Sequence, residues 1–173
     1  MVFFQLMPTI LIFFIVLLNV SKLKFAPIEI MVGATLVYAI VLIVTLVVMR
    51  IPAVMPVSDI LGNLTLAGCL VVLTYKKTKN VLLSGHYVLL TLVIGMIGNT
   101  IAGIPILMFF DATIEDFRNS LILHIIVILP TIIICHVMSK YMGNRLNQDY
   151  SRLSFDIKKK YAIYGFYIYT VPC

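Results

Sequence analysis

Basic residues occupy every second gap between the hydrophobic runs of this chain, a pattern typical of a polytopic membrane protein. The even gaps hold only Arg50 and Arg118. The odd gaps hold 11 of the 13 Lys and Arg residues: Lys22 and Lys24 in the first, Lys76, Lys77 and Lys79 in the third, and Lys140, Arg145, Arg152, Lys158, Lys159 and Lys160 in the fifth. Because basic residues in short loops stay cytoplasmic, the pattern predicts cytoplasmic odd gaps, external even gaps and an external N-terminus in the cell membrane.

The composition supports one membrane domain over residues 1–173. Hydrophobic residues make up 62% of the chain and charged residues 12%, whereas a soluble domain is nearer half apolar and about a quarter charged. The formal charge of +6 lies in gaps where anionic lipid headgroups attract it. We therefore expect membrane lipid as a partner and no nucleic acid.

Apolar run length predicts an all-α polytopic helix bundle with five full spans and the start of a sixth, because about 20 helical residues cross the hydrocarbon core. The fourth run is long, so we expect it to tilt strongly or to break near Pro105. Pro130 is expected to kink the fifth. The sixth run is too short to span, so we expect the natural protein to continue beyond Cys173. The runs cover residues 2–20, 28–49, 60–75, 81–110, 121–138 and 161–173.

A mixed segment over residues 140–160 follows the fifth run. Gly143 and Asn144 are expected to end the fifth helix there. Apolar residues then recur at roughly helical spacing, which predicts an amphipathic helix on the cytoplasmic face of the membrane. These residues are Leu146, Tyr150, Leu153 and Ile157.

Small residues in the fourth run predict a close helix contact. Gly98 and Ala102 form a small-xxx-small pair, Gly95 lies one turn earlier, and Asn99 adjoins the strip. Such strips let helices approach closely, and polar side chains beside them form hydrogen bonds between helices. We expect this face to pack on a neighbouring helix.

The fourth gap predicts a ligand site. Asp111, Glu115 and Asp116 make it net acidic, and Phe110 and Phe117 flank these acids. An acidic, aromatic external loop attracts a cationic, amphiphilic peptide. The alternative is a solvated loop with aromatic residues at the membrane interface.

The sequence offers no catalytic machinery, metal site or cofactor site. His124 and Cys135 share a helix face but are roughly 16 Å apart along the axis. Cys135 and His136 point about 100° apart. An intramembrane Cys/His peptidase would need Cys69 to meet His86 or a histidine of the fifth run. None of the metal-ligand, hydrolase or nucleotide-binding motifs occurs.

Two stretches, Leu70–Ile104 and Asn147–Thr170, resemble the membrane sensor region of Gram-positive peptide-pheromone receptor histidine kinases. These are quorum-sensing receptors of the accessory-gene-regulator, competence and plantaricin type. The resemblance implies six or seven spans followed by a cytoplasmic dimerisation helix and a kinase domain. The phosphorylated histidine and the ATP-binding motifs would then lie beyond Cys173, so His86, His124 and His136 take no part in phosphotransfer.

We interpret the chain as the membrane sensor region of a two-component histidine kinase that detects an external peptide and forms a homodimer. A small, complete membrane protein of transport-associated or bacteriocin-immunity type is the alternative.

Overall fold

The computed structural model describes residues 2–51, 58–111, 113 and 120–152, which form five α-helices and no strand. The prediction of an all-helical protein is confirmed. The sixth apolar run and most of the acidic loop lie outside the described residues. The helices are α1 (Val2–Ser21), α2 (Pro27–Met49), α3 (Ser58–Thr78), α4 (Val81–Phe109) and α6 (Leu121–Arg152).

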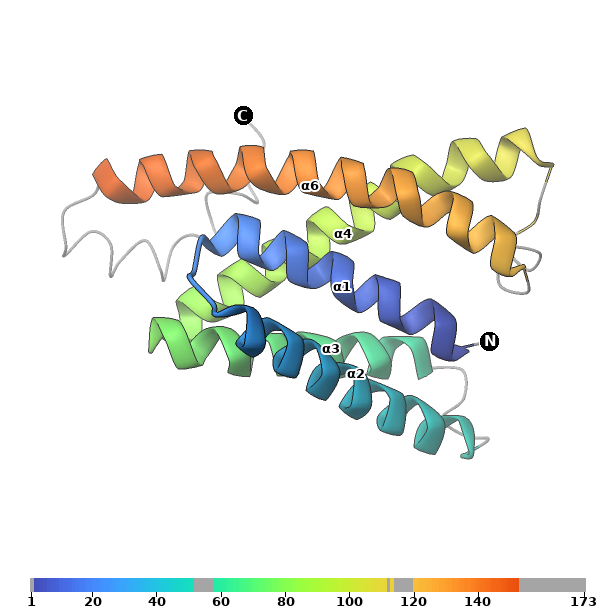
Figure 1. Cartoon of the computed structure of the whole chain (residues 1–173), viewed down its shortest axis with the longest axis horizontal. Coiled ribbons are helices and arrows are strands. Elements are labelled where there is room, and N and C mark those ends of the chain that lie inside the picture. The colour runs from blue at the N-terminus through green and yellow to red at the C-terminus, as the bar shows by residue number, and fades with distance from the viewer. Residues whose placement is uncertain (1, 52–57, 112, 114–119, 153–173) are drawn as a thin grey trace.

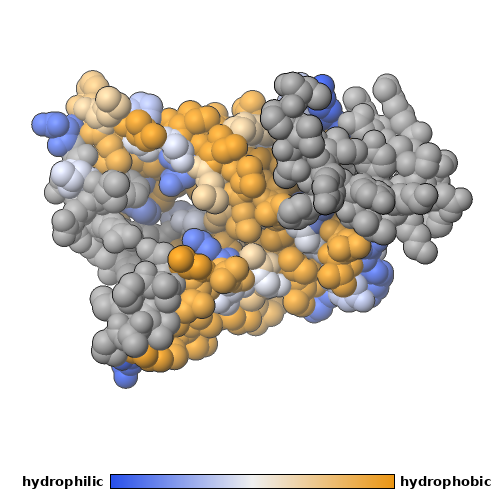
Figure 2. All heavy atoms as spheres, turned by 180° about the vertical axis from the view of Figure 1, so that it is seen from behind, coloured by the Kyte–Doolittle hydropathy of each residue, from blue (hydrophilic) through white to orange (hydrophobic). Residues whose placement is uncertain are grey.

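Within the described part of the chain, three helices are long and apolar enough to cross a membrane: α2, α4 and α6 over Leu121–Leu146. In α2, residues Gly33, Val37 and Val41 lie on the stripe that faces the bundle. The opposite face is also apolar, with Ile28 and Met31 about seven-tenths exposed. A helix that is apolar on all sides belongs in lipid or in a large core. Apolar residues cover much of the described surface on the face shown in Figure 2, so the fold is that of a membrane protein.

The five helices alternate in direction along the bundle (Figure 1). The α1–α2 and α3–α4 connections therefore lie at one end, together with the C-terminal part of α6. We call this the basic end, since it carries Lys22, Lys24, Lys76, Lys77, Lys79, Lys140 and Arg145. Arg50 and Asp111 lie at the opposite end, where α2 and α4 finish. The basic gaps of the sequence thus meet at one end of the folded chain.

Helix α1 occupies the centre of the bundle and packs against α2, α4 and α6. Its residues Phe14 and Leu17 join Val37, Leu70 and Val88 in one apolar core. A second core lies between α1, α4 and α6, around Val16, Val20, Ile94 and Cys135. Because α1 is apolar on several faces, it contributes buried side chains to both cores.

One predicted helix end is wrong, and of the two alternatives for the fourth run the break near Pro105 does not occur. Helix α4 continues through Pro105 to Phe109. A proline removes only one backbone N–H donor from the helix, and packing against neighbouring helices makes this loss tolerable. Helix α6 continues through Gly143 to Arg152. Gly143 is buried against α1, so it acts as a packing residue there and does not end the helix.

Candidate functional site

A polar contact joins α1 to α6 at the basic end. The Asn19 side-chain amide donates to Ser139 Oγ at 3.0 Å, and the same Nδ2 atom lies 3.2 Å from His136 Nδ1. The Ser139 hydroxyl, which is buried, donates to the carbonyl of His136 at 3.0 Å. Since Asn19 offers two amide hydrogens, one side chain of α1 contacts two residues of α6 that lie three positions apart.

Close backbone contact accompanies these hydrogen bonds. A Cβ at Gly143 would meet the Asn19 carbonyl oxygen and would lie 3.1 Å from Val20 Cα. Glycine is therefore the residue that lets α6 approach α1 here. Ser139 and Gly143 are four residues apart, which is the small-xxx-small spacing of close helix pairs. This spacing is visible in the sequence and would have identified the contact.

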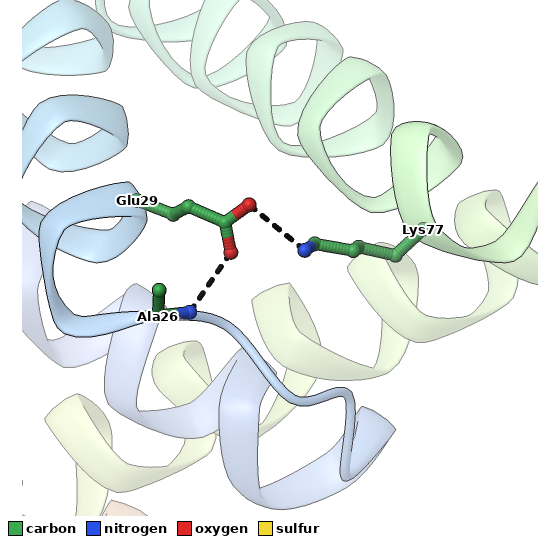
Figure 3. Close-up of polar contacts among 3 residues, drawn as sticks. All are labelled: Ala26, Glu29 and Lys77. Atoms are coloured by element: carbon green, nitrogen blue, oxygen red, sulfur yellow. Dashed lines mark hydrogen bonds and ion pairs between the residues drawn. The ribbon is translucent and has the colours of Figure 1, made fainter.

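A second contact at the basic end joins α2 to α3 (Figure 3). Lys77 Nζ lies 2.8 Å from Glu29 Oε1, and the other Glu29 oxygen accepts from the Ala26 backbone N–H at 2.8 Å. Glu29 thus caps the start of α2 while it binds the last turn of α3. Lys77 also lies 5.3 Å from the centre of the Phe25 ring, within the range of a cation–π contact.

The α3–α4 turn is held by hydrogen bonds of its own. Asn80 Oδ1 accepts from the Leu83 N–H at 3.2 Å, which caps α4. The Thr78 and Ser84 hydroxyls are 2.7 Å apart. Lys79 adopts a left-handed φ of 54°, the conformation that lets the chain reverse in so few residues. The basic end is therefore fixed at three helix junctions.

The predicted ligand residues are not gathered into a site within the described part of the chain. Phe110 and Asp111 are exposed where α4 ends. The Phe110 ring packs edge-on against Phe109, with ring centres 5.4 Å apart. Glu115, Asp116 and Phe117 lie outside the described residues. The peptide-site prediction therefore stays a prediction.

The residues of the predicted packing strip contact two different helices, and Asn99 beside them is exposed. A Cβ at Gly95 would meet the Phe13 ring of α1, and one at Gly98 would meet the Cys135 sulfur of α6. Ala102 is also buried. Asn99, in contrast, is exposed on the outer surface of the bundle.

Cys135 and His136 are directed to different neighbouring helices. The Cys135 thiol is buried and lies 3.7 Å from the Ile94 carbonyl of α4, whereas His136 contacts Asn19 of α1. Among the residues that the structure describes, no group of three or more His, Cys, Asp or Glu side chains could hold a metal. These contacts give Cys135 a packing role.

The fold and these contacts define the class: an all-helical membrane protein with helix junctions fixed at its basic end. Comparison with protein-family models, with curated proteins and with solved structures finds no match.

Proposed function

We propose that the chain is the membrane sensor region of a peptide-pheromone receptor kinase, with five spans followed by a sixth. The basic end is cytoplasmic and the N-terminus external in this proposal. The observation that carries it is the extension of α6 past the other helices at the basic end (Figure 1). Its 32 residues measure about 48 Å at 1.5 Å per residue, which exceeds the hydrocarbon core of about 30 Å.

Helix α6 is suited to carry a signal in this arrangement. It begins beside the acidic α4–α6 connection at the opposite end and continues without interruption beyond the basic end. A cationic peptide bound at the α4–α6 connection changes the position of α6 if it binds one arrangement more tightly than another. The hydrogen bonds of Asn19 to α6 are the contacts that such a movement would alter.

Topology is the first test. Thr113→Cys and Asn144→Cys are placed singly in a background without native cysteines, and both parent side chains are exposed. In intact cells an impermeant thiol reagent should label Thr113→Cys. It should label Asn144→Cys only after the membrane is permeabilised, because basic loops are retained inside. The reverse pattern would overturn the orientation and with it the external peptide site.

Signalling is the second test. The chain is fused ahead of the catalytic region of a receptor kinase, and autophosphorylation is measured with the peptide fraction of conditioned medium. A protease-treated fraction serves as the control. We expect a change in autophosphorylation with the intact fraction alone. An active fusion kinase that responds to neither fraction, in cells that the chain protects from a bacteriocin, would favour the immunity-type alternative.

A further inference from the structure

Asn99 places a polar side chain on the outer surface of α4 within the depth of a bilayer. The helix has 29 residues, about 42 Å at 1.5 Å per residue, with Asn99 about 27 Å from its first residue and about 15 Å from its last. A hydrocarbon core of about 30 Å that lies entirely within the length of this helix contains Asn99. Met96, three residues before Asn99 on the same side of the helix, is an exposed apolar side chain, so Asn99 adjoins an apolar surface.

Other polar side chains at similar depth are satisfied within their own helices. Thr91, Thr100 and Thr131 each donate to the carbonyl four residues earlier, at 2.7, 2.9 and 2.7 Å. Over the described part of the chain, the Asn99 amide has no such partner. A carboxamide carries two donor hydrogens and an acceptor, and hydrocarbon offers none of these a partner. An outward-facing Asn is therefore strongly unfavourable in a lone bundle.

We propose that Asn99 is a contact of a homodimer in which α4 packs against α4 of a second copy. A carboxamide both donates and accepts, so two copies related by a two-fold axis satisfy each other through the same residue. A single Asn in an apolar helix seam is also a device that specifies register and dimer formation. Because the Asn99 carboxamide can form hydrogen bonds with the same group of another molecule, a second copy of this chain is the partner that fits this face.

The residues beside Asn99 fit a helix contact. Met96 and Gly103 lie three residues before it and four after it, so they share its side of the helix. Met96 is 69% exposed, and its flexible side chain can fill an irregular seam. Gly103 is partly exposed, with only Val127 Cγ1 within 4 Å of a Cβ position, at 3.9 Å. The inference requires that α4 spans the membrane and does not depend on peptide sensing.

Cysteine cross-linking of the full chain in native membranes tests the contact. Asn99→Cys should form a disulfide-linked dimer on mild oxidation when native cysteines are replaced. Ile101→Cys is the matched control, since it lies about 200° around the helix and its parent side chain is 51% exposed. Equal cross-linking of the two variants, or none at Asn99→Cys, would overturn the α4–α4 contact.

A second measurement keeps the native cysteines. Dimer fraction is measured by energy transfer between labelled copies in liposomes over a range of protein-to-lipid ratios. Asn99→Leu should weaken dimerisation about five- to thirtyfold, the range of interhelical polar contacts between model membrane peptides, while Asn99→Gln should retain most of it. A monomer at all ratios, or an Asn99→Leu variant that dimerises as well as the parent, would mean that lipid or another segment of the chain covers Asn99.

Discussion

Glycine residues in these helices differ in the space around them, and that space predicts the effect of each substitution. A Cβ at Gly143 would meet backbone atoms of α1, which cannot rotate away, whereas nothing lies within 4 Å of a Cβ at Gly85. We expect Gly143→Ala to destabilise the protein by about 1–3 kcal/mol through overpacking. Gly85→Ala should stabilise it by up to about 1 kcal/mol through helix propensity. Thermal unfolding in detergent measures both, and equal midpoints would contradict the α1–α6 contact.

Gly98 differs from Gly143 because its neighbour is a side chain. A Cβ at Gly98 would meet Cys135 Sγ, while Cys135 Cβ would lie at an ordinary 3.7 Å. Gly98→Ala should therefore cost about 1–3 kcal/mol in the parent and much less beside Cys135→Ala. The four thermal midpoints of this double-mutant cycle give the coupling of the two sites. Additive effects would place Gly98 away from α6.

At the scale of the elements, the Glu29–Lys77 pair tests how α2 and α3 are joined. Both side chains are partly exposed, at 43% and 35%, so removing the pair should lower the unfolding midpoint only slightly, because water screens an exposed ion pair. Lys77→Glu should cost more than Lys77→Met because it opposes two carboxylates. Adding Glu29→Lys to Lys77→Glu should recover part of that loss. Unfolding midpoints at low and high salt measure these differences, and a reversed pair no better than Lys77→Glu would contradict the contact.

The helices were predictable from the sequence, but their roles in the bundle were not. Apolar length located the runs because a span needs about 20 apolar residues. Apolar composition does not indicate which helix is central, because α1 and α2 are both apolar and only packing buries Val16 and Val20. Gly143 misled the prediction for a physical reason: a glycine ends a helix or admits a neighbour, and local sequence does not distinguish the two. The outward position of Asn99 likewise depends on which neighbours α4 has.

At the scale of the whole molecule, the two ends differ in charge, and this asymmetry connects the topology with the proposed ligand. The basic end carries the lysines of both tight connections, and α6 extends beyond it. The opposite end leads into the sequence of Asp111, Glu115 and Asp116, flanked by Phe110 and Phe117. In the proposed function, an external cationic peptide would approach the end opposite the basic end, whereas α6 extends beyond the basic end.

The acidic connection gives the last prediction. Asp111→Asn, Glu115→Gln and Asp116→Asn together should weaken the response of the kinase fusion to the active peptide fraction. They should also flatten the salt dependence of that response, because ions screen long-range attraction. Phe110→Ala, which removes an exposed ring at the end of α4, should weaken the response with little change in salt dependence. The measurement is the dose–response of autophosphorylation at two salt concentrations, with membrane levels matched. If the triple variant keeps the parent dose and salt dependence, the peptide binds away from this connection, and α6 must receive the signal through its contacts with α1 and α4.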